Sequence, residues 1–319
     1  MNRLDAIVFN SHGVGQYAYT DRMPVWGETL EVHGWHIAED GGKGTNVSVA
    51  LGRLGIKTAY IGKVGNDPWG DLGELWMQKA NVDTTFLYRT DEVSTGTGLI
   101  LIGPDGQNTI IDGDSSSVKL TQEEVFNAID QLEGSQLFIT GFEVPQQLSI
   151  DGAKYAKSKG MQVALNPSPI NRNTIDDLSF VDYLFINENE LNILLNREHN
   201  HQVNLEIDLK NIKEKYNPRI VILTMGVQGS AAQLDGKIIV VEPVIVSNIV
   251  NTAGAGDGFM AATIARIIKG DTLINAMQWA SYYASLSITI EGTIPAYRYP
   301  DEVESFIKSK NKESNLYTE

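Results

Sequence analysis

The sequence contains no cysteine, and this absence excludes several kinds of site. A chain without thiols forms no disulfide, no thiolate zinc site and no cysteine nucleophile. Any metal ion must therefore be bound by oxygen ligands or by the five histidines. Oxygen ligands favour hard cations such as magnesium.

Long apolar runs are also missing. No window reaches the roughly 18 uninterrupted apolar residues that a membrane-spanning helix needs. The amino-terminal stretch MNRLDAIVFNSHG lacks the long apolar segment of a signal peptide. With 319 residues, 42% of them hydrophobic, the chain has enough apolar surface for a large core. We expect a globular protein in the cytoplasm.

Positive charge is scarce, because 25 lysines and arginines stand against 40 aspartates and glutamates, which gives a net charge of −15. Such a charge repels nucleic acid and anionic lipid unless a local basic patch overcomes it. The lysines near the C-terminus have glutamates at 304, 313 and 319 around them, so we expect residues 308–319 to form a solvated, frayed tail. The sequence thus predicts no nucleic-acid partner and no membrane partner.

The central part of the chain alternates strand-like and helix-like segments. The strand-like runs lie at 136–142, 162–167, 181–187 and 219–224. This alternation predicts parallel strands joined by helical crossovers, and therefore a doubly wound α/β sheet. Thr121 and Glu124 fit a capping box at the start of one of the helices.

The N-terminal third has a different pattern. Short strand-like runs separated by turn residues lie at 28–37, 84–89, 97–102 and 107–112. They predict a small additional sheet, formed by about 11–40 and 84–112, which closes over a cleft as a lid. Because no internal repeat or linker interrupts the pattern, we expect residues 1–319 to form a single domain.

The stretch NTAGAGDGF, residues 251–259, precedes a helical pattern that begins near Ala255 or Gly256. Glycines let backbone amides turn toward an anion, and the positive end of the helix dipole favours phosphate there. Asp257 is suited to take the proton of an attacking hydroxyl while the amides stabilise the transferred phosphoryl group. The alternative is a tight turn in which Asp257 only interacts with the helix dipole.

A second glycine-rich stretch, GGKGTNVSVALGRLG at 41–55, also precedes a helical pattern. Lys43, Thr45 and Asn46 supply donors for polyhydroxy or phosphate ligands. NTAGAGDGF lacks the Walker spacing, and neither stretch has the dinucleotide fingerprint with its acidic residue about 20 positions on. These absences argue against a nicotinamide dehydrogenase.

Together, GGKGTN and GAGDG resemble the two signatures of the ribokinase-like (PfkB) family of carbohydrate kinases. Further stretches agree with that family in order and context: WGET (26–29), STGTGLIL (94–101), FEVP (142–145), LNPSP (165–169), INENELN (186–192) and LTMGVQG (223–229). The resemblance covers nearly the whole chain. It implies a three-layer αβα sandwich with a mostly parallel central sheet and a small β-sheet lid.

The resemblance also implies roles for individual residues. Asp257 would be the general base, and the amides from Ala253 to Gly256, Gly254 and Ala255 included, would form the anion hole. The sugar would contact Gly42, Lys43, Asn46 and Glu143. The nucleotide would contact Asn187, Thr224, Gly226, Gly229 and Gly256. Magnesium would be held, through waters, by Asn187 and Glu190. The alternative role of this pair is to cap the helix that begins near Glu188.

The function implied is transfer of the γ-phosphoryl group of ATP to a primary hydroxyl of a pentose, a hexose or a related polyhydroxy compound. Magnesium would be the cofactor, and a homodimer would form through the lids. Two alternatives stay open. One is a nucleoside kinase of the same fold, with Tyr17, Tyr19 or Trp35 near a base. The other is a sugar-sensing or nucleotide-sensing protein without turnover.

Gly15 is the first departure from the family pattern, because it stands where the family has an acidic residue that accepts hydrogen bonds from sugar hydroxyls. A missing acceptor weakens discrimination for hydroxyls presented there. We therefore expect an acceptor other than plain ribose, or an altered orientation, with His12 or Gln16 as substitutes. Gly13 and Gly15 are expected to leave room for a bulkier group.

Asn251 is the second departure, because the family commonly has aspartate at the head of the anion-hole motif, in a loop that often binds a monovalent cation. The neutral amide removes one charge, and Ala296 lacks a hydroxyl ligand near the same loop. We expect weak or absent activation by potassium, measured as equal rates in potassium and sodium. The histidine pairs 33/36 and 199/201 lack a third ligand, and we expect no metal site at either.

Overall fold

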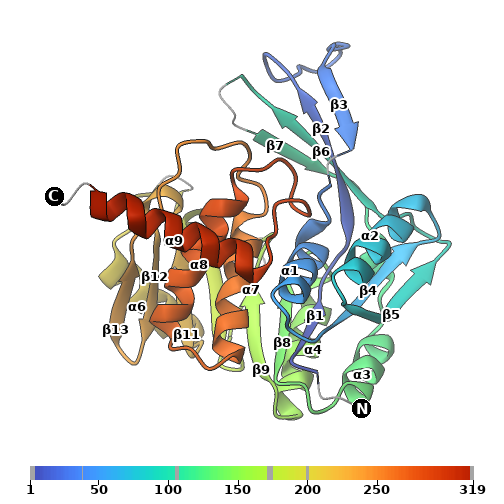
Figure 1. Cartoon of the computed structure of the whole chain (residues 1–319). Coiled ribbons are helices and arrows are strands. Elements are labelled where there is room, and N and C mark those ends of the chain that lie inside the picture. Colours follow the sequence, from blue (N-terminus) through green and yellow to red (C-terminus); the bar gives the residue numbers. More distant parts are fainter. Residues whose placement is uncertain (1–3, 38, 105–107, 171–174, 199–200, 317–319) are drawn as a thin grey trace.

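The computed structural model describes residues 4–37, 39–104, 108–170, 175–198 and 201–316, with side chains up to residue 310 except at 108. Its strands form a nine-stranded sheet and a four-stranded sheet, and helices cover both faces of the larger one (Figure 1). Within the described ranges, no helix is both long enough and apolar enough to cross a membrane.

The nine-stranded sheet has the order β13-β12-β11-β10-β9-β8-β1-β4-β5. Its strands are β1 (Ala6–Phe9), β4 (Thr58–Gly65), β5 (Asp83–Thr90), β8 (Leu137–Gly141), β9 (Gln162–Asn166), β10 (Tyr183–Asn187), β11 (Ile220–Thr224), β12 (Ser230–Leu234) and β13 (Lys237–Val241). All pairs are parallel from β5 to β11, and β12 and β13 are added antiparallel. The carboxyl ends of the parallel strands therefore share one edge of the sheet.

Two helical layers bury the two faces of this sheet. One layer contains α1 (Gly42–Arg53), α2 (Pro68–Lys79), α7 (Ala255–Ile268), α8 (Leu273–Ser287) and α9 (Pro300–Leu316). The other contains α3 (Gln122–Gln131), α4 (Gln146–Ser158), α5 (Glu188–Leu194) and α6 (Leu205–Tyr216). In β1, Ala6 and Val8 pack into the first core cluster while Ile7 and Phe9 pack into the second. A strand covered on both faces needs this continuous apolar sequence.

The smaller sheet consists of β2 (Gly13–Tyr19), β3 (His33–Ile37), β6 (Gly96–Ile102) and β7 (Asn108–Asp112), in the order β3-β2-β6-β7. It projects from the sandwich next to the start of α1 (Figure 1). Tyr17 and Ile100 are paired in register on its buried face. This sheet is the lid that the sequence predicts.

The predicted three-layer sandwich with a mostly parallel sheet and a small lid sheet is confirmed. The assignment of 84–89 to the small sheet is wrong, because β5 pairs in parallel with β4 at the edge of the large sheet. Phe86 packs into one core cluster and Leu87 against the other, so both faces of β5 are covered.

Two smaller expectations differ from the structure in extent. Of the predicted strand 28–37, only His33–Ile37 is a strand. The predicted tail at 308–319 overlaps α9, which continues to Leu316, and residues 317–319 lie outside the described residues. The frayed state of this tail stays a prediction.

Candidate functional site

The site lies where the order of the strands reverses. From β1 the chain proceeds to β4 on one side, and β8 lies on the other side of β1. Crevices that bind ligands in open α/β sheets lie outside the carboxyl ends of the strands at such a point. A cavity here is lined by Asn10 after β1, by Thr140 of β8 and by Asn166 of β9.

The start of α7 forms one wall of this cavity. Its N-cap is Gly254, whose φ of 71° is in the left-handed region, and no side chain caps the helix. Among the described residues, the amides of Gly254, Gly256 and Asp257 have no hydrogen-bond acceptor. Uncapped amides at a helix start are suited to bind an anion. Two predicted anion-hole amides are used instead: Ala253 N–H donates to Asn251 Oδ1 (2.9 Å) and Ala255 N–H to Thr252 O (3.3 Å).

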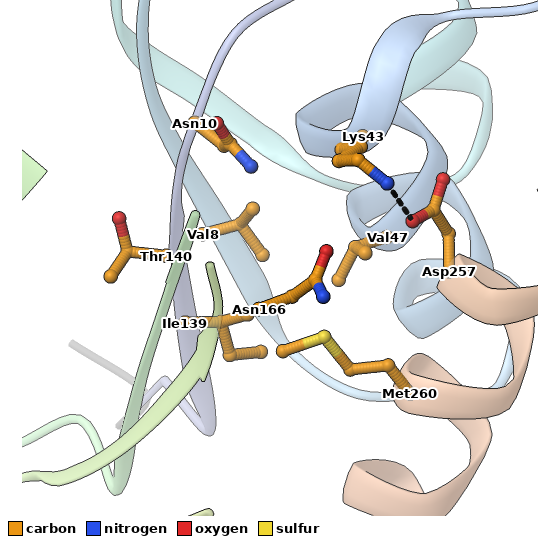
Figure 2. Close-up of a pocket in the computed structure, with 9 residues that line it drawn as sticks. All are labelled: Val8, Asn10, Lys43, Val47, Ile139, Thr140, Asn166, Asp257 and Met260. Carbon is orange, nitrogen blue, oxygen red and sulfur yellow. Dashed lines mark ion pairs between the residues drawn. The ribbon is translucent and has the colours of Figure 1, made fainter. Parts of the chain in front are cut away.

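Asp257, in the first turn of α7, is 9% exposed and faces this cavity (Figure 2). Its Oδ1 lies 3.7 Å from the ammonium nitrogen of Lys43, and its Oδ2 accepts a 3.0 Å hydrogen bond from Asn46 Nδ2. Both partners belong to α1, so the starts of α1 and α7 meet at this carboxylate. The two contacts fix the orientation of the carboxylate.

Lys43 and Glu143 add opposite charges to the same place. Burial alone lowers the pKa of Lys43, but the carboxylates of Asp257 and Glu143 outweigh it, so that the pKa lies above its usual value. Burial raises the pKa of Glu143 to about 8, although the charge of Lys43 acts in the opposite direction. Glu143 Oε2 also accepts a 2.9 Å hydrogen bond from the backbone amide of Lys43. The lysine thus remains a cation within a cluster of acids.

Asn46 was predicted to bind sugar hydroxyls, and its side chain has a full set of protein partners. Its Oδ1 accepts from Gly41 N (3.2 Å) and Thr293 Oγ1 (2.6 Å). Its Nδ2 donates to Asp257 Oδ2 (3.0 Å) and Asp40 Oδ1 (3.3 Å). An amide has two donor hydrogens and one acceptor oxygen, so these contacts use all of its capacity. Asn46 orients two carboxylates.

A second cavity adjoins the first and shares Lys43, Asn166, Asp257 and Met260 with it. It extends to the ends of β10 and β11 and is also lined by Asn187, Glu190, Thr224 and Gly256. Asn187 and Thr224 are register partners on the two strands. The structure therefore brings the predicted metal pair and three of the predicted nucleotide residues, Asn187, Thr224 and Gly256, to the same crevice as Asp257.

Asn187 and Glu190 form a capping box at the start of α5. Asn187 Oδ1 accepts from Glu190 N (2.8 Å), and Glu190 Oε2 accepts from Asn187 N (2.9 Å). Asn187 and Glu190 therefore do cap this helix, which is the alternative role that the sequence analysis gave for the pair. It leaves Glu190 Oε1 without a partner in the described part of the chain, next to the cavity. No group of three or more acidic or histidine side chains is arranged to hold a metal ion among the described residues.

Gly226 and Gly229 form the turn after β11 and are not among the residues that line either cavity. Gly229 has a φ of 85°, and a Cβ atom there would lie 2.2 Å from Val241 O. The turn therefore requires glycine at this position whether or not a nucleotide binds.

The space next to Gly15 is filled, which contradicts the expected extra room. A Cβ atom on Gly15 would lie 2.8 Å from Ile100 Cδ1 and 3.1 Å from Asp40 Cβ. A Cβ atom on Gly13 would lie 3.2 Å from Gly96 O. The argument for a bulkier acceptor therefore fails, because Ile100, Asp40 and Gly96 already fill the space next to these two glycines.

His12 does not substitute for the missing acid, because its ring is fully buried away from the cavities. Its nitrogens lie 2.8 Å from Thr45 Oγ1 and 3.0 Å from Trp69 O. Gln16 accepts a hydrogen bond from Trp35 on the lid (3.0 Å). Sequence analysis missed Asp40, a carboxylate beside Gly15, although its place directly before GGKGTN was a visible signal.

Asn251 connects the start of α7 to the lid. Its Nδ2 donates a 2.7 Å hydrogen bond to the hydroxyl of Tyr17, on β2. Burial raises the pKa of Tyr17 to about 12, so the phenol stays neutral. Of the two histidine pairs, His36 lies 3.5 Å from Glu291, and His199 lies outside the described residues.

Comparison of the sequence with known families and proteins identifies its relatives. The family described as pfkB family carbohydrate kinase matches residues 18–298. Ribokinase of Staphylococcus aureus (strain COL) is 29% identical over 298 residues, which are 93% of this chain and 97% of that protein. Deoxyribokinase of Salmonella typhi is 28% identical over 307 residues, which are 95% of this chain and 99% of that protein.

Solved structures show the same fold. Ribokinase from Giardia lamblia has a TM-score of 0.87 at 18% identity, over 97% of this chain and 99% of that one. Arabidopsis thaliana ribokinase complexed with ribose and ATP has a TM-score of 0.81 at 24% identity, over 96% and 99%. A putative ribokinase II of E. coli in complex with ATP and Mg²⁺ has a TM-score of 0.79 at 21% identity, over 96% and 99%.

Proposed function

The chain belongs to the pfkB family of carbohydrate kinases, ATP-dependent phosphotransferases, and from this premise we propose its reaction. We propose that the γ-phosphoryl group of ATP passes to a primary hydroxyl of a pentose, a hexose or a related polyhydroxy compound, with Asp257 as general base. One observation carries this proposal: Asp257 lines both cavities and stands in the uncapped first turn of α7.

The proposed chemistry conserves atoms and charge in a simple way. The acceptor oxygen forms a bond to the γ-phosphorus while the bond from that phosphorus to the bridging oxygen of ADP breaks. Asp257 takes the hydroxyl proton and later returns it to solvent. The free amides of Gly254 and Gly256 bind the oxygens of the transferred group, which stabilises its charge during transfer.

We assign the acceptor to the first cavity. Support comes from Lys43, whose ammonium group reaches Asp257, and from Glu143, whose carboxylate lies at the backbone of Lys43. Gly42 has a φ of 66°, and a Cβ atom there would come within 3.4 Å of Glu143 Oε2. Glycine at 42 is required by this left-handed backbone and brings the backbone next to Glu143, which is not itself among the residues that line the two cavities. Asn46 contributes by orienting Asp257.

We assign the nucleotide to the second cavity and to the turn that follows β11. Thr224 and Asn187 line this cavity, and Gly256 places the start of α7 at its other end. The turn formed by Gly226 and Gly229 continues from Thr224 along the same edge. This arrangement supports a triphosphate that points from the ends of β10 and β11 toward Asp257.

Magnesium fits the donor set at the start of α5. Glu190 Oε1 and the amide side chain of Asn187 are the groups that would hold the hydrated ion, since oxygen ligands and retained waters suit it. When bound, it would neutralise phosphate charge on ATP. The capping box holds Glu190 in place for this role.

The neutral Asn251 is why we propose little activation by a monovalent cation. Its amide donates to Tyr17 and accepts from Ala253, so no carboxylate stands at this point of the loop. Further proposals are a cytoplasmic location, where ATP is abundant, and a homodimer that forms through the lids. The exposed apolar side chains of β3 and β7 support the dimer.

The test is ATP consumption by the wild type and by Asp257→Asn. A panel of D-ribose, 2-deoxy-D-ribose, D-fructose and ribitol is assayed for ADP release with ATP and magnesium. We expect the variant to lose about 10²- to 10⁴-fold in kcat for the best acceptor, because a general base contributes about that factor. Binding of a nonhydrolysable ATP analogue is expected to change little. A variant with wild-type turnover would refute the assignment of Asp257, and a wild type that binds but never turns over would indicate a sensor.

A further inference from the structure

Asp40 is a carboxylate linked to Asp257 through Asn46, although it is not among the residues that line the two cavities. The proposed reaction has no use for it so far. Asp40 stands two residues before the start of α1 and lies beside β2, since Gly15 N–H donates to Asp40 O (3.3 Å). A Cβ atom on Gly15 would be 3.1 Å from Asp40 Cβ and 3.5 Å from Asp40 Oδ2. The side chain of Asp40 therefore occupies the place into which a side chain at position 15 would point.

The two oxygens of Asp40 have different surroundings. Oδ1 accepts from Gly42 N (3.2 Å) and from Asn46 Nδ2 (3.3 Å). Thr293 Oγ1 also lies 3.3 Å from it, but its single proton is directed to Asn46 Oδ1 at 2.6 Å. Oδ2 has no protein donor among the described residues. One half of the carboxylate is anchored and the other half is free to accept.

Asn46 also fixes where this free oxygen lies relative to the general base. The same amide nitrogen donates to Asp40 Oδ1 at 3.3 Å and to Asp257 Oδ2 at 3.0 Å. The two carboxylates are thus a few ångströms apart and held as a unit. Burial raises the pKa of Asp40, and the charge of Asp257 raises it further. Asp40 is partly exposed, and its Oδ2 is not one of the buried side-chain oxygens that lack a donor. A ligand hydroxyl that donates to this oxygen forms a charge-assisted hydrogen bond.

We propose that Asp40 is a specificity-determining residue of the kinase, whose Oδ2 accepts a hydrogen bond from a second hydroxyl of the acceptor. This inference rests on the proposed function. Glycine at 15 makes this position of Asp40 possible, because any larger residue at 15 would collide with the Asp40 side chain. The acceptor must therefore present, near its reacting hydroxyl, a second hydroxyl that Asp40 can reach.

The test exchanges the carboxylate between the two positions. Gly15 has an ordinary negative φ, so a side chain at 15 is prevented by its neighbours and not by the backbone. The variants are Asp40→Ala, Gly15→Asp and the double variant Gly15→Asp/Asp40→Ala. Glu39→Ala is the matched control, because it removes an exposed carboxylate one residue away.

We expect Asp40→Ala to raise KM for the best sugar of the panel by about 10- to 100-fold, since hydrogen bonds to charged groups have about that effect. KM for ATP is expected to stay within about threefold. Gly15→Asp alone should lose a similar factor because it displaces Asp40. The double variant should regain at least about tenfold over Asp40→Ala, since a carboxylate has returned and the carboxyl group of Asp40 no longer fills its place. The remaining close neighbour of a Cβ atom at 15 is Ile100 Cδ1 (2.8 Å), the end of a flexible side chain that can shift. Glu39→Ala should match the wild type.

Asp40→Asn keeps the shape of the side chain but removes its negative charge. If Asp40→Ala does not fold, this variant tests the proposal in its place. Sugar binding, measured calorimetrically with a nonhydrolysable ATP analogue, should weaken in Asp40→Asn while the analogue still binds. Unchanged sugar KM and affinity in the Asp40 variants would overturn this inference alone, provided that Asp257→Asn has lost turnover. No recovery in a folded double variant would also overturn it. A wild type that neither binds nor phosphorylates any sugar of the panel would overturn the proposed function together with this inference.

Discussion

At the scale of single residues, two glycines at the start of α7 have different roles: one is required by the backbone conformation, and the other leaves space for a bound phosphate. Gly254 has a φ of 71°, and a Cβ atom there would lie 2.6 Å from both Thr293 Cγ2 and Tyr297 Oη. Gly256 has an ordinary φ and nothing within 4 Å of such an atom. One glycine is needed by the fold, and the other leaves open space over the cavity.

We expect Gly254→Ala to lower the free energy of unfolding by about 1–3 kcal/mol, because a left-handed residue gains a colliding methyl group. Gly256→Ala should keep or slightly raise stability, since alanine is favoured over glycine in helices by about 0.5–1 kcal/mol. It should nevertheless raise KM for ATP. Urea unfolding and steady-state kinetics measure both effects. Equal loss of stability in the two variants would contradict the distinction.

Glu143 predicts a dependence of stability on pH. Its pKa in the folded protein is about 8, above the ordinary 4.5, because of burial. The fold thus favours the protonated form, and this contribution is complete below about pH 4.5 and disappears as the pH rises toward 8. As the pH rises from 5 to 8, we expect the Tm of the wild type to fall by several degrees relative to the Tm of Glu143→Gln. Differential scanning fluorimetry measures this, and a constant Tm difference across that range would exclude the proposed cause.

At the scale of elements, His12 holds the junction between β1 and β2 against α1 and α2. Its ring contacts Thr45 and Trp69, and a Cβ atom on Gly73 of α2 would lie 2.3 Å from the ring. Burial lowers the pKa of His12 from 6.5 to about 4. The segment between β1 and β2, from which the lid extends, therefore packs in this way only when the imidazole ring of His12 is neutral.

The stability that His12 contributes should be present above about pH 6.5 and should be lost as the pH falls toward 4. In this range the histidine is protonated in the unfolded chain, whereas in the folded protein it stays neutral. This loss amounts to about 3 kcal/mol at most. In His12→Gln, urea unfolding between pH 7 and pH 4.5 should show a smaller decrease than in the wild type. Parallel pH profiles for the two proteins would show that the ring is not responsible.

The elements also show how far the sequence determines the structure. Buried strands such as β8 and β10 could be predicted because both faces are apolar, and the start of α7 could be placed by its glycines. β5 was misassigned because it mixes apolar and polar residues like a lid strand, and its pairing with β4 depends on distant packing. Asp40 was missed for a similar reason: its contact with Gly15 exists only after β2 and β3 have paired.

At the scale of the whole molecule, the lid sheet presents an apolar face to solvent. Gln16 pairs with Ile37, and Leu99 pairs with both Gln16 and Ile111, so these residues share one face. Ile37 is 47% exposed and Ile111 is 52% exposed. Trp35, two residues before Ile37 on the same strand, is 57% exposed. An apolar sheet face of this kind is a candidate contact between two copies of the chain.

We expect the wild type to be dimeric at micromolar concentration and Ile37→Glu to weaken the dimer about 100-fold or more, because a charge would be buried in the contact. Ile207→Glu, a control on α6 with a similar exposure of 55%, should remain dimeric. Light scattering after size-exclusion chromatography measures the mass of each species. A wild type that is monomeric at every concentration would remove the basis for the lid contact.

The β2–β3 part of the lid leaves the sandwich four residues after the end of β1, at Gly13, and returns two residues before the start of α1, at Asp40. Its far turn, 20–32, contains no strand and carries a fully exposed Trp26. Insertions there would disturb neither the large sheet nor the reactive centre. A fluorescent reporter inserted into this turn would lie on the lid sheet, outside the large sheet. A change in its emission on addition of a sugar would then serve as an optical assay of ligand binding.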